Sequence, residues 1–339
     1  MTDRTIAGDP VRASEALRLM WTIRLFEEAV DELFARGLMH GTMHLSIGQE
    51  ATATGVCLAL RDDDLITSTH RGHGHCIAKG ADPLPMMAEL LAKETGYCRG
   101  RGGSMHIADV ARGNLGANGI VAGGIPIAVG AALAHQMKDT GRVVACFFGD
   151  GATNEGAFHE AANLAAVWGL PVILVCENNK YGMSLSTDYS MRVATVAERA
   201  AAYGFPGVRV DGNDLDVVHA AARDAVERAR FGAGPTLLDC VTYRWKGHSK
   251  SDKNLYRTRE EIEAWRATDP ISTFEQVVRD AETLSRDDLD AVREQARATV
   301  RDAVREAMQA PDADPAALIT DLPRAVYAAP LGENKKVSA

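Results

Sequence analysis

Short apolar runs alternate with helical segments through the middle of this chain, between residues 143 and 243. Strands with two apolar faces must be covered on both sides, as the strands of a parallel sheet are. The alternation therefore predicts an α/β fold, in which a parallel sheet carries helices on both faces. The expected strands are Val143–Phe148, Pro171–Cys176, Val208–Val210 and Thr236–Tyr243, and the expected helices are Glu155–Trp168, Val196–Tyr203 and Leu215–Phe231.

The segments that flank this alternation predict further helices. Residues 12–36 carry apolar side chains at helical spacing as far as Gly37, and residues 259–309 have the pattern of charged amphipathic helices. Residues 328–339 are polar and show no periodicity. We therefore divide the chain into an N-terminal helical arm (1–36), an α/β domain (37–258), a C-terminal helical region (259–327) and a disordered tail (328–339).

The composition excludes several classes of protein. A formal net charge of −9 argues against an extended nucleic-acid surface, which would need a basic excess. The six cysteines form no C-x-x-C pair, so no disulfide framework is expected. The longest apolar stretch, Gly119 to Ala134, is broken by glycines and Pro126, and residues 1–10 lack the apolar core of a signal peptide. We expect a cytoplasmic protein without a nucleic-acid or membrane partner.

A glycine-flanked aspartate, Gly149-Asp150-Gly151, follows the first predicted strand and precedes a helix. Glycines at such a corner let backbone N–H groups approach a phosphate. The carboxylate of Asp150 would repel a diphosphate unless a cation lay between them, and Mg²⁺ is the usual bridge. The motif predicts a magnesium-bridged diphosphate at the carboxyl end of this strand.

A second oxygen donor, Asn179, lies at the end of the next predicted strand, 179 − 150 = 29 positions after Asp150. One helix and one strand fit in this interval, so both side chains should emerge at the same edge of the sheet. A dinucleotide site is the alternative, with Glu177 as the ribose-binding acid. Against it, Asn154 stands where the third glycine of G-x-G-x-x-G would be, and an aspartate occupies the phosphate turn.

The stretch GDGATNEGAFHEAANLAAVWGLPVILVCENNKYGMS, residues 149–184, resembles the α subunit of the thiamin-diphosphate-dependent component of 2-oxo acid dehydrogenase complexes. The resemblance runs from about residue 15 to about residue 270 and implies the thiamin-diphosphate-binding fold. It implies Mg²⁺ bound by Asp150, Asn179 and the backbone carbonyl of Tyr181. It also implies a diphosphate held at Gly149, Gly151 and Ala152.

Further site residues follow from the same resemblance. His70 and Arg71 would contact the diphosphate, the backbone of Gly119 and Val121 would face the aminopyrimidine ring, and Met183 would support the bent cofactor. His248, in a loop that folds over the cofactor, would contact the diphosphate and act with His44 in catalysis. The alternatives are a core position for Met183, a structural role for His44, a solvated loop around His248, and a zinc site made of His70, His73, His75 and Cys76.

The resemblance also implies partners. The glutamate that meets the aminopyrimidine belongs to a β subunit in this family, so we expect an α₂β₂ assembly, an inactive isolated α chain, and a lipoyl acyltransferase component that accepts the acyl group. The segments STHRGHGHCIAKG and TYRWKGHSKSD resemble acetoin dehydrogenases more than pyruvate dehydrogenases, which usually carry Tyr-Arg at His70-Arg71. Acetoin is the favoured substrate, with pyruvate, a branched-chain 2-oxo acid, or a non-catalytic cofactor-binding role as alternatives. Ser249 matches a serine that is phosphorylated in mitochondrial relatives, but we expect no such modification of Ser249 or Ser251 here.

Overall fold

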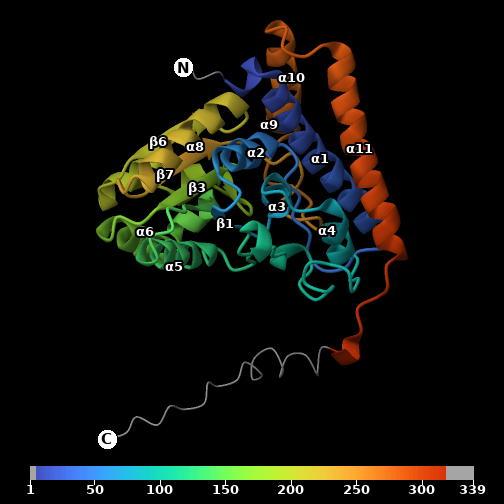
Figure 1. Ribbon diagram of the computed structural model, residues 1–339, viewed down its shortest axis with the longest axis horizontal. Helices are drawn as coiled ribbons and strands as arrows, with labels where there is room; N and C mark the ends of the chain where they lie inside the picture. The colour runs from blue at the N-terminus through green and yellow to red at the C-terminus, as the bar shows by residue number, and fades with distance from the viewer. Residues whose placement is uncertain (1–4, 318–339) are drawn as a thin grey trace, which may run out of the picture.

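The central element is a five-stranded, wholly parallel sheet (Figure 1), seen in a computed structural model that describes residues 5–317. The strand order is β1-β2-β3-β7-β6. The strands are β1 (Leu65–Thr67), β2 (Val144–Gly149), β3 (Val172–Asn178), β6 (Gly207–Asp211) and β7 (Thr236–Val241). The predicted fold class, a parallel sheet with helices on both faces, is confirmed.

Side chains alternate along each strand between two apolar cores, one on each face of the sheet. In β2, Ala145 and Phe147 join the core beneath α2 and α8, whereas Val144, Cys146 and Phe148 join the core beneath α5 and α6. The helices on these faces are α2 (Glu50–Ala59), α3 (His73–Ala78), α5 (Gly124–Met137), α6 (Gly156–Val167) and α8 (Leu215–Arg230). Nearly continuous apolar sequence in the central strands follows from this double burial.

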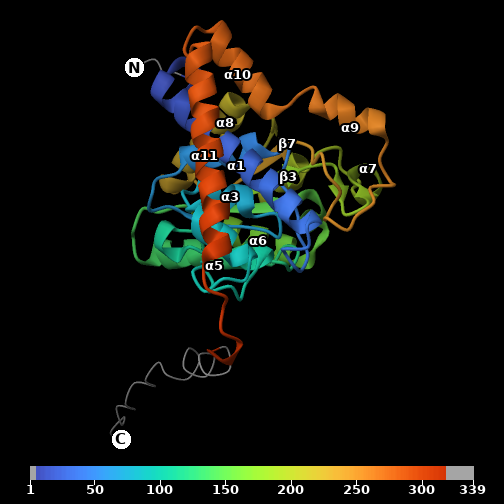
Figure 2. The same cartoon turned by 90° about the vertical axis from the view of Figure 1, so that its right-hand side faces the viewer.

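The terminal helices form a separate layer beside α2 and α3. Helix α1 (Pro10–Ala35) and helix α11 (Arg286–Gln309) run side by side, as Figure 2 shows, and α11 also packs on α4 (Pro83–Leu90). Arg24 of α1 joins the layers, since its guanidinium pairs with Glu50 at 2.5 Å and with Asp269 at 2.8 Å. Helix α10 (Pro270–Asp280) belongs to this layer and contacts α1 and α2. Helix α9 (Arg259–Arg266) lies apart from it (Figure 2), and its Glu261 accepts hydrogen bonds from the hydroxyls of Tyr181 and Tyr243.

Short elements complete the description. They are the 3₁₀ helices η1 (Ile6–Gly8), η2 (Ser104–His106), η3 (Val110–Arg112), η4 (Asp150–Asn154) and η5 (Ala197–Tyr203), the helix α7 (Thr187–Ser190), and the hairpin strands β4 (Tyr181–Gly182) and β5 (Leu185–Ser186). No helix within residues 5–317 has the length and apolar character needed to cross a membrane.

Most predicted elements lie within a few residues of their observed bounds, but three details differ. The helix expected at 196–203 is a 3₁₀ helix, η5. Strand β1 was not predicted, because three residues are too few to show a periodicity. The helix at 73–78 was not predicted either, because its glycine-spaced histidines resemble a loop. The division into four segments stays a prediction, and the tail at 328–339 lies outside the described residues.

Candidate active site

A cavity of about 460 Å³ opens at the carboxyl ends of β2 and β3, where open α/β sheets bind their ligands. Loops that follow β1, β2, β3 and β7 form its walls together with the segment before α5. Every residue assigned to the site from the sequence lies on these walls. They are His44, His70, Arg71, Gly119, Val121, Gly149, Asp150, Gly151, Ala152, Asn179, Tyr181, Met183 and His248.

The inner end of the cavity holds an unpartnered carboxylate. Asp150 begins η4 directly after β2 and is 2% exposed, and its Oδ2 atom has no hydrogen-bond partner among the described residues. Burial raises the pKa of Asp150 to about 6, although Arg244 and backbone N–H groups, including that of Gly151, favour the charged form. A buried carboxylate oxygen that has no partner and faces a cavity indicates a ligand-binding group.

Two further oxygens meet beside a buried arginine. The Nη1 atom of Arg244 donates to Oδ1 of Asn179 at 3.0 Å and to the carbonyl of Tyr181 at 2.7 Å. A single cationic group thus bridges both oxygens. Carboxylate, amide and carbonyl oxygens are the ligands that Mg²⁺ prefers, so the donor set of Asp150, Asn179 and Tyr181 fits this ion. In this structure the guanidinium of Arg244 donates hydrogen bonds to two of these three groups, Asn179 and Tyr181.

The glycines of the two motifs let the β2 and β3 loops approach each other closely. A Cβ atom at Gly151 would lie 3.2 Å from the Cα atom of Gly182, which is tighter than ordinary van der Waals contact. The absence of side chains at Gly151 and Gly182 therefore allows the loop after β3 to lie close to the corner that holds Asp150.

A second buried guanidinium lies across the cavity. Arg71 is 3% exposed and donates to two carbonyl groups, that of Leu45 at 2.5 Å and that of His248 at 2.9 Å. Neither Arg71 nor Arg244 forms an ion pair with a carboxylate of the described residues. Burial lowers the pKa of Arg71 to about 10, which still leaves it charged at neutral pH. Two buried cations without counter-ions make this end of the cavity suitable for a polyanion.

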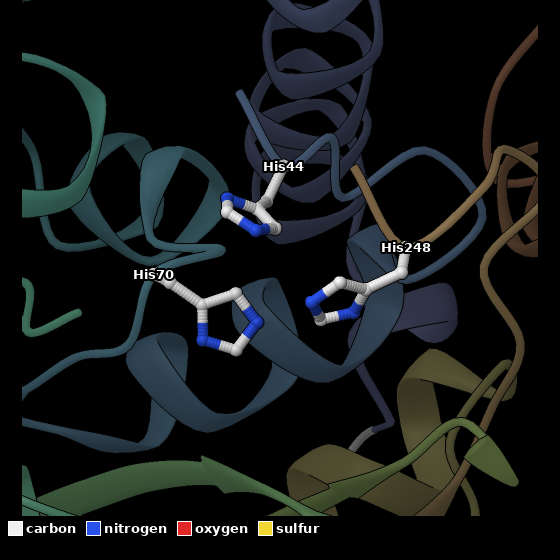
Figure 3. A group of neighbouring side chains, drawn as sticks. All are labelled: His44, His70 and His248. Carbon is white, nitrogen blue, oxygen red and sulfur yellow. The ribbon is translucent and has the colours of Figure 1, made fainter. Parts of the chain in front are cut away.

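Three histidines from three separate segments, His44, His70 and His248, point toward one another at the wall of the cavity (Figure 3). The ring centroids of His44 and His70 are 4.6 Å apart, those of His44 and His248 are 5.0 Å apart, and those of His70 and His248 are 5.4 Å apart. Within residues 5–317 none of their ring nitrogens has a hydrogen-bond partner, and Nδ1 of both His44 and His248 is buried. The cluster therefore presents unsatisfied donors and acceptors to the cavity.

All three imidazoles are neutral at physiological pH. Burial, followed by repulsion from Arg71, lowers the pKa of His44 to about 3, that of His70 to about 2 and that of His248 to about 4. The ligand nitrogens of the three rings lie within 4.8 Å of one another, close enough to share a metal ion. Histidines that bind a metal usually donate their other ring N–H to a carboxylate or carbonyl, however, and no ring of the cluster has such a partner among the described residues.

The outer rim of the cavity is apolar and exposed. Ile120 is 75% exposed, Val121 50%, Met183 65% and Leu185 53%. A core position for Met183 is therefore wrong. Exposed apolar side chains gathered at the mouth of a cavity mark a surface that another molecule covers.

Comparison with known proteins identifies the family. Residues 18–316 match the family model of the dehydrogenase E1 component. The chain belongs to the dehydrogenase E1 component family. The predicted resemblance is confirmed.

Three relatives illustrate the similarity of this E1 chain. The α subunit of acetoin:2,6-dichlorophenolindophenol oxidoreductase from Bacillus subtilis is 55% identical over 256 residues, 75% of this chain and 77% of the relative. The subunit of the same name from Cupriavidus necator is 48% identical over 306 residues, 90% of this chain and 92% of the relative. The α subunit of the pyruvate dehydrogenase E1 component from Porphyra purpurea is 41% identical over 312 residues, 90% of each chain.

Family membership explains why these groups line the cavity. E1 dehydrogenases depend on thiamin diphosphate, and they are oxidoreductases that combine an α with a β subunit. The buried arginines and the oxygen cluster are the groups that a magnesium diphosphate would need. The thiamin-diphosphate-binding fold predicted from the sequence is thus confirmed by the sheet and the family together. The alternative of a dinucleotide site is wrong.

The zinc site considered for His70, His73, His75 and Cys76 is also wrong, because these side chains do not converge. His73 bonds Glu27 and Ser104, and His75 bonds Ser68 and Glu177. Cys76 accepts a hydrogen bond from Asn114. Of these three histidines, His70 lines the cavity, whereas His73 and His75 do not.

Arg244 was missed in the sequence. It follows β7 at the same edge of the sheet as Asp150 and Asn179, and this position is the signal that would have found it. Arg244 also fixes the loop of His248. Its Nη2 atom donates to the hydroxyl of Tyr256 at 2.7 Å, and Asp252 accepts from that hydroxyl and from the backbone N–H of His248, each at 2.7 Å. The loop of His248 is therefore an ordered wall of the site rather than a solvated segment.

Proposed function

We propose that this chain is the α subunit of an acetoin dehydrogenase that uses thiamin diphosphate and Mg²⁺. The observation that carries the proposal is the cluster of three neutral, unpartnered imidazoles above the cavity floor. The two α subunits of acetoin oxidoreductases, at 55% and 48% identity, support acetoin over pyruvate, since the pyruvate dehydrogenase α subunit from Porphyra purpurea is 41% identical. Pyruvate and branched-chain 2-oxo acids are the alternative substrates.

Each end of the cofactor has matching groups in the cavity. Asp150, Asn179 and the carbonyl of Tyr181 would hold Mg²⁺, and the corner formed by Gly149, Gly151 and Ala152 would receive the diphosphate. Arg71 and His70 would contact the same diphosphate, the backbone of Gly119 and Val121 would face the aminopyrimidine, and Met183 would support the ring system. When bound, thiamin diphosphate supplies the carbanion that attacks a carbonyl carbon and takes up the electron pair of the broken C–C bond.

The histidine cluster fits a hydroxyketone substrate. When the bond between the carbonyl carbon and the carbinol carbon of acetoin breaks, the hydroxyl proton must pass to a base while the hydroxyl oxygen becomes the aldehyde oxygen. A 2-oxo acid loses CO₂ without such a transfer. The Nδ1 atoms of His44 and His248 have no hydrogen-bond partner among the described residues, so these imidazoles are free to accept this proton and later return it.

A β subunit would complete the site at its apolar rim. The carboxylates that line the cavity are Asp150 and Glu177, both at strand ends, so no described side chain of the rim can meet the aminopyrimidine as an acid. Helix α5 continues the apolar rim, because Gly124–Met137 has no charged residue and yet Ile127 is half-exposed. We infer that the β subunit covers this face and supplies the missing glutamate in an α₂β₂ assembly, and that the lipoyl acyltransferase component receives the acyl group.

Turnover by the reconstituted αβ assembly tests the substrate. We expect acetoin to reduce 2,6-dichlorophenolindophenol with a kcat/KM at least tenfold above that of pyruvate, a difference of about 1.4 kcal/mol in transition-state stabilisation. Equal or better use of pyruvate would overturn the choice of acetoin. Turnover of either substrate by the α chain without β would overturn the shared active site.

A further inference from the structure

Two histidines in the His73-Gly74-His75 motif have no role in the proposed function. Both are fully buried on α3, and each uses both ring nitrogens. Nδ1 of His73 lies 2.9 Å from Oε2 of Glu27, and its Nε2 lies 2.9 Å from the hydroxyl of Ser104. The chain has thus enclosed a carboxylate–imidazole–hydroxyl series in its core, away from the cavity.

Glu27 is the centre of this series. It lies on α1, is 0% exposed, and accepts two hydrogen bonds at its other oxygen, from the backbone N–H of Ser46 at 2.8 Å and from the hydroxyl of Ser46 at 2.7 Å. Burial by itself would raise the pKa of Glu27, but His73 and Ser46 outweigh this effect and lower it. The carboxylate therefore stays charged, and all of its stabilisation comes from these two neighbours.

Each neighbour in the series belongs to a segment that also lines the cavity. Ser46 is two residues after His44, His73 is two residues after Arg71, and Ser104 directly precedes Met105. Three segments that are far apart in the sequence thus share one anchor on α1.

The packing around the anchor leaves little freedom for the segments to slide. A Cβ atom at Gly74 would lie 3.1 Å from the hydroxyl of Ser46 and 3.4 Å from Ile23 of α1, so the two loops and the helix are already in close contact. Phe26 closes the other side, with its ring centroid 5.7 Å from that of His73. If a hydrogen bond is lost here, one of the segments must shift, because the space is too small for a water molecule to replace the missing group.

We propose that Glu27 is a positioning residue that, through His73 and Ser46, sets the relative placement of His44, Arg71 and Met105 in the cavity. The proposal depends on the proposed function only for what those three residues bind. Their placement is a property of the chain alone and is measured without cofactor.

Hydrogen–deuterium exchange on the full chain, co-expressed with its companion subunit, gives the first test. Glu27→Gln keeps the size of the side chain but removes its charge. We expect faster exchange in all three segments (residues 43–47, 69–75 and 102–107), and affinity for thiamin diphosphate with Mg²⁺ weaker by on the order of 10–100-fold. The control is Asp64→Asn, because Asp64 is equally buried, pairs with Arg230 at 2.6 Å and precedes β1 at the far end of the sheet. It should lower the melting temperature without either effect.

If Glu27→Gln does not fold, a milder variant tests the same proposal. Ser104→Ala removes one neutral hydrogen bond at the end of the series. Because Glu89 already holds the preceding segment through the backbone N–H groups of Cys98, Gly100, Gly102 and Gly103, this variant should fold. We expect faster exchange at the Ser46 N–H as well as near Ser104, since the effect travels through His73 and Glu27.

The outcomes separate the two proposals. Exchange that changes only around the substituted residue, or that changes equally in Asp64→Asn, would overturn the positioning role of Glu27. If the parent assembly does not bind thiamin diphosphate, the proposed function fails, but the exchange measurements still decide the role of Glu27.

Discussion

Within six residues this chain carries histidines in opposite environments. The ring of His70 faces the cavity and has no hydrogen-bond partner among the described residues, whereas His73 and His75 each have a partner at both ring nitrogens. Buried polar groups in folded proteins are almost always satisfied, so an unsatisfied group in a cavity is kept for a ligand and a satisfied group serves the fold. The difference separates ligand-binding from scaffold residues where the sequence alone does not.

The same contrast holds for two buried carboxylates. Glu27 accepts from Ser46 and pairs with His73, and its pKa is lowered. Asp150 keeps one oxygen without a partner, and its pKa is raised to about 6 by burial. Both oxygens of Glu27 already have partners, whereas Oδ2 of Asp150 would gain one when a cation binds. Substitutions should therefore have opposite consequences for stability and function in the two sets.

The largest effect should come from Asp150→Ala. We expect the loss of magnesium-dependent binding of thiamin diphosphate, measured by calorimetry on the αβ assembly, because no other charged oxygen lies at this position. The free energy of unfolding of the cofactor-free protein should stay the same or rise by about 1–3 kcal/mol, since an unpaired buried group is removed. Asp64→Asn is the control that should lose stability and keep the affinity. Retained affinity in Asp150→Ala would contradict the assignment of the metal site.

His248→Asn should come next. We expect kcat for acetoin to fall by about 10²–10⁴-fold, the usual range for the loss of a group that transfers a proton. The melting temperature should not fall, because the ring of His248 makes no hydrogen bond with the protein. The exposed His106 provides a control in His106→Asn. A loss of less than tenfold in His248→Asn would show that the cluster is not the proton acceptor.

His73→Ala should mainly reduce stability. It leaves the buried carboxylate of Glu27 without its imidazole, which costs about 3–5 kcal/mol in comparable buried pairs. By contrast, His70→Asn should leave the free energy of unfolding at neutral pH unchanged within about 0.5 kcal/mol. Urea denaturation of the two variants measures both quantities. Equal losses of unfolding free energy in His73→Ala and His70→Asn would contradict the distinction between cavity and scaffold histidines.

The last effect appears only below neutral pH. The pKa of His70 is about 2 in the folded chain and that of His248 is about 4, both below the usual value for histidine. The unfolded chain therefore binds protons first as the pH falls, so the stability is complete above pH ~6.5 and declines from there toward pH ~4, by at most about 1.4 kcal/mol per pH unit for each histidine. His70→Asn should reduce this slope, whereas the same substitution at the exposed His40, outside the cavity, should not. A slope that is unchanged in His70→Asn would contradict the burial of a neutral cluster.

The alternation of apolar runs was enough to predict the parallel sheet, because strands buried on both faces leave a strong pattern. The positions of the two proposed metal ligands were predictable for the same reason, as Asp150 and Asn179 follow the two clearest strands. Strand β1 and helix α3 were not predictable, since each is short and depends on its neighbours for stability. Arg244 was missed because an arginine after a strand has no distinctive spacing.

The sequence by itself determined the alternation of strands and helices between residues 143 and 243, the family, and the position of Asp150 and Asn179 at strand ends, because these depend on local periodicity and on motifs that chemistry restricts to a few residue types. Only the tertiary structure decided which histidines serve the cavity. His70, His73 and His75 have the same side chain, and their environments differ because Glu27, Ser104 and Glu177, from other parts of the chain, and the nearby Ser68 satisfy two of them. Asp150 and the cluster of His44, His70 and His248 keep unsatisfied atoms because no neighbour among the described residues reaches those atoms.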